Sequence, residues 1–235
     1  MSVSMFSVMI RAIPFFPTRH RIKVALASLG EKFFGLDFSM PDRMYDRGRG
    51  DGAMYLASSD EMLEKLFSCV DMDKPHGFLD IGCGKGYVLW RARMWGFSKV
   101  GGVEYDEKLL GICRKNLQRL KLANRITPVC CDACGFEGYG DYDVFYFFNP
   151  FGEEIMRKVM HRITEQCQGK EVMLLYYRPR YAGAIEECGC FQCVSEFFDP
   201  ERGYNARVYR GIIPKKAEQI IPKKAEQEID KTDCR

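Results

Sequence analysis

The chain has 235 residues, of which 46% are hydrophobic and 29% are charged, and its formal net charge is +3. Such a composition supplies enough apolar side chains for a core and excludes a chain that is disordered throughout. The length suits one α/β domain with short additions. The nearly balanced charges give no strong nucleic-acid signal, and no run reaches the ~18 apolar residues of a transmembrane segment.

Eleven cysteines are a high and odd number. No usable secretion signal is present, so we expect free thiols in a reducing compartment and a cytoplasmic protein. Cys-x-x-Cys spacing, which is typical of zinc sites, occurs at 131–134 and at 190–193. Both pairs fall in or beside expected strands, where side chains three apart point to opposite faces. We therefore predict buried or partly exposed thiols and no metal.

The first 54 residues are interpreted as an N-terminal extension that is basic and partly helical, because its prolines break any long helix. Residues 1–30 contain no Asp or Glu but four Lys or Arg. Such a segment is typical of transit peptides and of helices that contact a membrane surface. We favour the plainer interpretation, an extension packed on the domain.

From residue 55 to residue 211, strands and helices alternate and define the expected domain. The expected strands are 78–81, 99–104, 126–131, 144–148, 172–177, 191–197 and 206–210. The expected helices are 62–67 (with Ser58 and Ser59 as candidate caps), 86–95, 107–122, 153–166 and 182–187. This order predicts an α/β fold with a seven-stranded, mostly parallel sheet, helices on both faces and a terminal antiparallel hairpin.

The tail from 212 to 235 contains a direct repeat. Residues 212–219 and 220–227 both read Ile-Ile-Pro-Lys-Lys-Ala-Glu-Gln. Two copies of eight residues cannot form a solenoid, and the segment is polar, so we expect a disordered tail.

A glycine-rich turn follows the first expected strand, at residues 78–86. Its glycines have the spacing Gly-x-Gly-x-Gly, whereas a dinucleotide fingerprint has Gly-x-Gly-x-x-Gly. An acid, Asp80, lies just before the turn. A carboxylate there would repel a pyrophosphate but would suit a ligand with a cationic amino group. Spacing and acid together favour S-adenosylmethionine.

The run from Leu79 to Gly86 resembles the first motif of the class I (Rossmann-like) S-adenosylmethionine-dependent methyltransferases. The resemblance covers about residues 55 to 210 and implies a Rossmann-like fold, methyltransferase activity and S-adenosylmethionine as cofactor. Within this motif, the resemblance assigns cofactor binding to Asp80, Gly82, Cys83, Gly84 and Gly86.

Two further acids extend the resemblance. Glu104 ends the second strand, followed by Tyr105, and in the family such an acid accepts hydrogen bonds from the ribose hydroxyls. Asp132, just past the third strand, resembles the acid that meets the adenine amino group, with Cys131 and Ala133 beside the ring. Each acid alone is also compatible with a solvated strand end. Their order, at three successive strand ends, favours a cofactor site.

The candidate reaction site is Asn149-Pro150-Phe151, after the fourth strand. It resembles the Asn-Pro-Pro-Tyr/Phe motif of amino-directed methyltransferases, in which the Asn oxygen orients the target nitrogen and an aromatic ring packs beside it. Asn149 therefore belongs to both the catalytic and the cofactor-binding sets. One proline of the motif is missing, which leaves the nitrogen acceptor open. A plain proline turn is the competing interpretation.

The sequence thus predicts an S-adenosylmethionine-dependent methyltransferase that acts on a nitrogen of a protein side chain or small molecule, with the acceptor unknown. The alternatives are an inactive scaffold with the same fold and an O-directed small-molecule methyltransferase. A nicotinamide-dependent oxidoreductase is disfavoured by the glycine spacing. No Ser/His/Asp or Cys/His arrangement supports nucleophilic hydrolysis.

Overall fold

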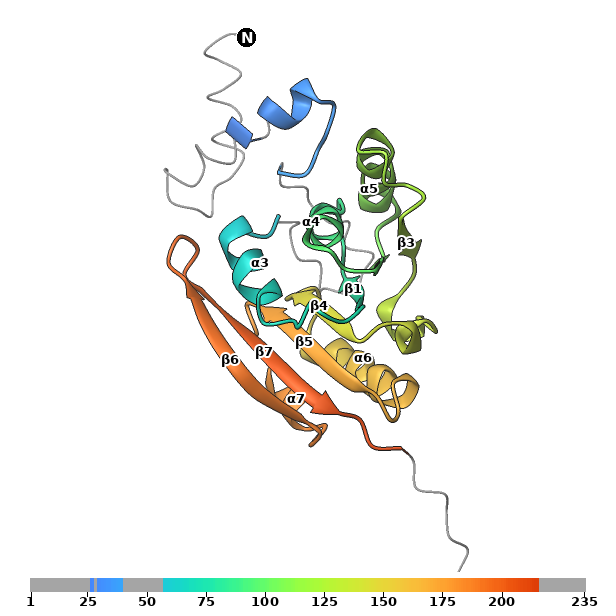
Figure 1. The fold of residues 1–235 in the computed structure, drawn as a ribbon, viewed down its shortest axis with the longest axis vertical. Helices are drawn as coiled ribbons and strands as arrows, with labels where there is room; N and C mark the ends of the chain where they lie inside the picture. The colour runs from blue at the N-terminus through green and yellow to red at the C-terminus, as the bar shows by residue number, and fades with distance from the viewer. Residues whose placement is uncertain (1–25, 28, 40–56, 216–235) are drawn as a thin grey trace, which may run out of the picture.

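The structure, a computed structural model, describes residues 26–27, 29–39 and 57–215. Most of the predicted N-terminal extension and of the predicted tail therefore lies outside the described residues. The described part contains one seven-stranded sheet with the order β3-β2-β1-β4-β5-β7-β6 (Figure 1). The predicted α/β fold, with a mostly parallel sheet and a terminal antiparallel hairpin, is confirmed.

The strand boundaries follow the hydrophobic runs closely. The strands are β1 (Gly77–Ile81), β2 (Lys99–Glu104), β3 (Ile126–Cys130), β4 (Val144–Phe148), β5 (Glu171–Tyr177), β6 (Phe191–Asp199) and β7 (Tyr204–Ile212). Strands β1 to β5 pair in parallel, and β7 runs antiparallel to both β5 and β6. The carboxyl ends of the five parallel strands therefore meet at one edge of the sheet, where ligands bind in open α/β folds.

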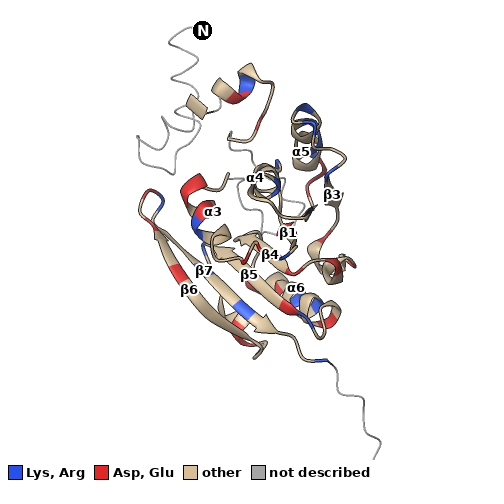
Figure 2. Cartoon of the chain, in the orientation of Figure 1, with Lys and Arg blue, Asp and Glu red and all other residues tan. Residues whose placement is uncertain are grey.

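Helices cover both faces of the sheet. They are α3 (Asp60–Phe67), α4 (Tyr87–Trp95), α5 (Glu107–Arg119), α6 (Glu153–Gln166) and α7 (Gly183–Glu186). Two short 3-10 turns, η1 (Ala133–Gly135) and η2 (Tyr139–Asp141), were not predicted. Both α3 and α6 carry acidic and basic side chains (Figure 2). No helix in the described ranges is long and apolar enough to cross a bilayer.

Local chemistry fixes the helix ends. The Ser59 hydroxyl accepts a hydrogen bond from the Met62 N–H at 3.2 Å, which caps α3 as expected. The Asp106 carboxylate caps α5 in the same way. This helix ends at Arg119, three residues before the predicted end. Lys121 has φ 58°, a left-handed conformation in which the helix cannot continue.

Side chains alternate along each strand and build a core on either face of the sheet. In β1, Phe78 packs with α3, α4 and α5, whereas Leu79 packs on the opposite face with α6. In β4, Tyr146 packs on the same face as Phe78, and Phe147 packs on the same face as Leu79. All four side chains are at most 1% exposed, and each contributes about 1.5–3 kcal/mol through burial.

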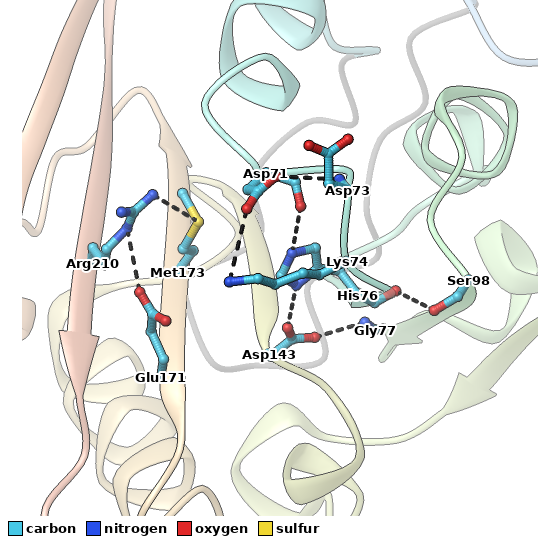
Figure 3. A network of polar contacts seen from close by, with 10 residues as sticks. All are labelled: Asp71, Asp73, Lys74, His76, Gly77, Ser98, Asp143, Glu171, Met173 and Arg210. Atoms are coloured by element: carbon cyan, nitrogen blue, oxygen red, sulfur yellow. Dashed lines mark hydrogen bonds and ion pairs between the residues drawn. The ribbon is translucent and has the colours of Figure 1, made fainter.

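A polar network at the opposite, amino edge of the sheet ties β1 to β4 (Figure 3). The His76 ring contacts the Asp143 carboxylate through Nδ1 and the Asp71 carbonyl through Nε2. Asp143 also accepts from the Gly77 N–H at 2.6 Å. His76 therefore holds the strands together at the edge away from the glycine turn.

The end of β7 lies beyond the predicted domain boundary. Ile212 is the last residue of β7 and pairs with Glu171, and Ile213 is buried. The Ile213 N–H donates to the Lys170 carbonyl at 2.9 Å. The first residue of the repeat thus belongs to the sheet, because β5 begins early enough to pair with it, and the second packs into the core beside it.

Candidate functional site

The glycine turn joins β1 to α4 at the carboxyl edge of the sheet. Gly82, Gly84 and Gly86 have φ values of 88°, 51° and 83°, which favour glycine. A Cβ on Gly82 would lie 2.6 Å from Pro150 Cβ, and a Cβ on Gly86 would lie 2.5 Å from Cys113 Sγ. The turn therefore needs glycine at these two positions for space as well as for conformation.

Four backbone N–H groups of the turn donate hydrogen bonds within the protein. Gly82 and Cys83 donate to the Val103 carbonyl (2.8 and 3.0 Å), Gly84 to Glu104 Oε2 (2.8 Å) and Gly86 to the Cys83 carbonyl (2.9 Å). A turn that binds pyrophosphate points such groups at the ligand instead. The geometry therefore disfavours a dinucleotide.

Two buried carboxyl groups lie beside the turn, on the neighbouring strands β1 and β2. Asp80 and Glu104 are each 3% exposed. Burial, and secondarily the charge of Glu104, raise the pKa of Asp80 well above its ordinary value. Burial also raises the pKa of Glu104, partly offset by N–H donors from Asp106 and Gly84. A cationic group would relieve the unfavourable ionisation of this pair.

The Glu104 carboxylate retains capacity for a ligand. Its oxygens accept the backbone N–H groups of Gly84 and Asp106, both at 2.8 Å, and the Tyr105 N–H also donates to this carboxylate. An ionised carboxylate offers about four acceptor positions. The remaining positions fit hydroxyl donors such as those of a ribose. Tyr105, the next residue, is 36% exposed at the same strand end.

Asp132 and Ala133 lie just past β3, at the same edge. The Asp132 carboxylate accepts from the Cys134 N–H at 3.0 Å and caps η1. Ala133 is buried, and its carbonyl accepts from the Tyr139 hydroxyl at 2.8 Å. Both residues therefore have structural tasks in the protein, and their contact with a cofactor stays a prediction.

Cys83 lies in the turn, but its thiol does not line the edge. The side chain is 4% exposed and belongs to the core on the α4 and α5 side of the sheet, with Cys113. The cofactor contact of Cys83 stays a prediction, and it would involve the backbone of this residue because the thiol packs in the core. The ten cysteines in the described ranges are free, and no three His, Cys, Asp or Glu side chains there group around one position.

Asn149 follows β4 and lies beside the glycine turn, since the next residue, Pro150, packs against Gly82. Its φ is 42°, a strained value for a residue with a side chain. Its side-chain oxygen Oδ1 is buried and has no hydrogen-bond partner among the described residues. Phe151 is half-buried against the α6-side core, so its ring packs away from the face on which Asp80 lies.

An ion pair behind the turn, buried at its lysine end, was not predicted. Lys85 is 1% exposed, and its Nζ lies 2.8 Å from Asp37 Oδ1. The Asn116 side chain bonds the N–H and the carbonyl of Asp37 and the carbonyl of Lys85. Phe38 stacks on Trp90 at 5.7 Å. This part of the N-terminal extension therefore packs on the domain. The partners are 31 or more positions apart, which no local pattern reveals.

Comparison with known proteins decides the family. Residues 78–168, which include the glycine turn and the ends of β2, β3 and β4, match the family model of a methyltransferase domain. Residues 78–168 form a class I S-adenosylmethionine-dependent methyltransferase domain. The cofactor of such domains is S-adenosylmethionine, and the turn and the buried acids described above fit it.

Two curated relatives overlap this methyltransferase domain. A protein-L-isoaspartate O-methyltransferase of Thermotoga maritima is 37% identical over 100 residues, which are 41% of this chain and 31% of that protein. An rRNA N(6)-adenosine-methyltransferase of Caenorhabditis elegans is 30% identical over 105 residues, 41% of this chain and 48% of that protein. The chain thus spans less than half the length of either relative.

Solved structures share the fold of the methyltransferase domain. An RNA methyltransferase from Salinibacter ruber, in complex with S-adenosyl-L-homocysteine, has a TM-score of 0.50 and 20% identity, with 70% of this chain and 97% of that chain covered. A protein of the NADB-Rossmann superfamily from Streptococcus agalactiae has a TM-score of 0.53 and 16% identity, with 66% and 69% covered. At these identities the likeness concerns the fold.

Proposed function

We propose that the methyltransferase domain transfers the methyl group of S-adenosylmethionine to a nitrogen atom of a small molecule or protein side chain. The supporting observation is the buried Asn149 oxygen, which lacks a hydrogen-bond partner in the described part of the chain. Burying such an acceptor unpaired costs about 1–3 kcal/mol. An N–H group of a bound acceptor would satisfy it.

The chemistry of an amide favours nitrogen over oxygen as the acceptor. When one N–H of an amino group donates to Asn149, the nitrogen lone pair stays free to attack the methyl carbon. A hydroxyl group is a weak nucleophile until a base removes its proton. Asn149 accepts hydrogen bonds but is no such base. The described histidines lie elsewhere, His76 at the amino edge and His161 exposed on α6.

The cofactor supplies a methyl group on a sulfonium sulfur, which leaves as a neutral thioether. The chain's own task is to hold and align the two reactants and to exclude water. Asp80, Glu104 and Asp132 would hold the cofactor through its amino, ribose and adenine groups. The contact between Pro150 and Gly82 keeps Asn149 beside the turn that holds the cofactor.

The relatives leave the acceptor open, because one is named for an oxygen acceptor and the other for a nitrogen. The activity is therefore argued from this chain's own residues. We also propose a reducing compartment such as the cytoplasm, on the strength of the free thiols.

Asn149→Gly tests the proposal. Glycine tolerates a φ of 42° and removes only the side chain, so the backbone stays unstrained. We expect S-adenosylhomocysteine to bind within about twofold of the parent protein, while methyl transfer to an amine acceptor falls about 10²–10³-fold, as for a lost oriented hydrogen bond in a transition state. Calorimetry and transfer of a labelled methyl group measure the two effects.

The rivals predict other results. A scaffold would bind S-adenosylhomocysteine yet label no acceptor in amine, hydroxyl and lysate panels. An O-directed enzyme would label hydroxyl acceptors in preference to amines, with a rate that depends on a titrating base. Either result would remove the nitrogen assignment.

A further inference from the structure

The carboxyl ends of β4 and β5 carry a second strained residue beside Asn149. In the parallel pairing of these strands, Phe148 and Tyr177 are register partners. Asn149 and Arg178 follow them, and neighbouring strands lie about 4.8 Å apart. Arg178 has φ 55°. Such conformations cost of order 1–3 kcal/mol and cluster at functional sites, and here two of them are adjacent.

Aromatic rings pack beneath Arg178, on the α3-side core. Phe148 and Tyr177 stack with centroids 4.4 Å apart, and Tyr204, the first residue of β7, packs on Tyr177 at 6.1 Å. The Arg178 guanidinium lies over the Tyr204 ring at 4.4 Å. We name Phe148, Tyr177 and Tyr204 the aromatic row. The aromatic row holds the Arg178 guanidinium against an apolar surface at the carboxyl edge of the sheet, the edge at which Asn149 also lies.

Arg178 differs in its partner from the arginines of the domain that form ion pairs. Arg91, Arg157 and Arg162 each pair with acidic side chains. No carboxylate in the described ranges lies within ion-pair distance of Arg178, whose side-chain contact is the Tyr204 ring. The nearby acid Asp199 is already bonded to the Tyr177 hydroxyl and to two backbone N–H groups.

A second guanidinium borders the same aromatic row. Arg202 lies 6.0 Å from the centroid of Phe148 and donates to the Ala57 carbonyl at 2.7 Å. Its Nε is buried without a hydrogen-bond partner among the described residues. Two guanidinium groups therefore border one row in a partly buried setting, where an anion binds more strongly than at an open surface.

We infer that Arg178 receives an anionic group of the methyl acceptor, a carboxylate or a phosphate, while Asn149 holds the reacting nitrogen. The acceptor class is then an amine that also carries an acidic group, separated from its nitrogen by at least the spacing of neighbouring strands, about 4.8 Å. Guanidinium groups bind both kinds of oxyanion through paired hydrogen bonds. This inference rests on the proposed nitrogen transfer, because it uses Asn149 to fix the position of the acceptor.

Binding of small probes tests the inference without turnover. The full chain, saturated with S-adenosylhomocysteine, is titrated with 4-aminobenzoate, 4-aminophenylphosphonate and the neutral 4-aminobenzamide. We expect at least one anionic probe to bind tenfold or more tightly than the amide, with the better of the two identifying the oxyanion. Arg178→Met should lower the affinity for that anionic probe about tenfold and leave the affinity for the amide unchanged.

Two further variants make the result specific. Arg178→Lys keeps a charge over Tyr204 but loses the paired geometry, so we expect an intermediate loss for the anionic probes. Arg180→Met removes a neighbouring exposed charge and should leave all three affinities unchanged. Unaltered S-adenosylhomocysteine affinity shows that each variant is folded.

Equal binding of amide and anions, no binding of any probe, or equal effects of Arg178→Met and Arg180→Met would overturn the inference. Failure of the proposed function is separate, since it shows as absent methyl transfer whatever the probes do.

Discussion

Asp80→Asn should weaken cofactor binding and stabilise the folded protein at the same time. The carboxylate is 3% exposed, so solvent screens it little. Replacing it with an amide of the same shape removes a charge-assisted contact to the cofactor's amino group, worth about 1.5–3 kcal/mol. Affinity for S-adenosylhomocysteine should therefore fall about 10-fold to 150-fold.

The stability gain follows from the direction of the pKa shift. Burial and the Glu104 charge raise the folded-state pKa of Asp80 above its ordinary 3.8. A group with a raised folded pKa contributes stability that is fully present below the unfolded pKa and is lost as pH rises through the folded pKa. The amide does not titrate. The variant should thus match the parent near about pH 4 and exceed it near about pH 8.

Urea unfolding at several pH values and calorimetry with S-adenosylhomocysteine measure both effects. Asp141→Asn is the matched control, because Lys99 lowers the pKa of this exposed carboxyl group. Its loss should leave cofactor affinity unchanged and give no stability gain at high pH. Unchanged affinity in Asp80→Asn, or a variant less stable than the parent near about pH 8, would refute the reasoning.

Three further changes probe the scaffold. Gly82→Ala should lower the unfolding free energy by more than about 1–2 kcal/mol and slow turnover, because its Cβ clashes with Pro150; a stable, active variant would contradict this. In urea unfolding, Asp37→Asn should destabilise by about 1–3 kcal/mol, and Lys85→Met by less, since only the lysine end of this pair is fully buried. Ser59→Ala should cost about 1 kcal/mol through the lost cap of α3.

The elements that the sequence predicted best are those with strong local signals. Strand β2 and helix α6 begin and end at the predicted residues. The short buried run of β2 is bounded by the charged residues Lys99 and Glu104, and the apolar residues of α6 have a clear helical period that starts after Gly152. The predicted strands of the terminal hairpin are too short. Strand β6 is half-exposed along most of its length, so its ends lack a hydrophobic boundary.

The three acids could be assigned to one edge from sequence because parallel strands carry their carboxyl ends to the same side. Asp80 and Glu104 indeed lie at the ends of β1 and β2, and Asp132 lies just past the neighbouring strand β3, although their cofactor contacts stay predictions. The strained pair at Asn149 and Arg178 could not be found in this way. It depends on the register of β4 against β5, which no local pattern encodes.

The hydrogen bonds within the glycine turn affect how ligands bind and dissociate. Because the turn's N–H groups bond to Val103, Cys83 and Glu104, its shape is complete before any ligand arrives. Association then avoids the ordering of loop backbone, which would cost about 1–2 kcal/mol per residue. A preorganised turn of this kind keeps its conformation when the product leaves. This suits a cosubstrate that must be exchanged once in every catalytic cycle.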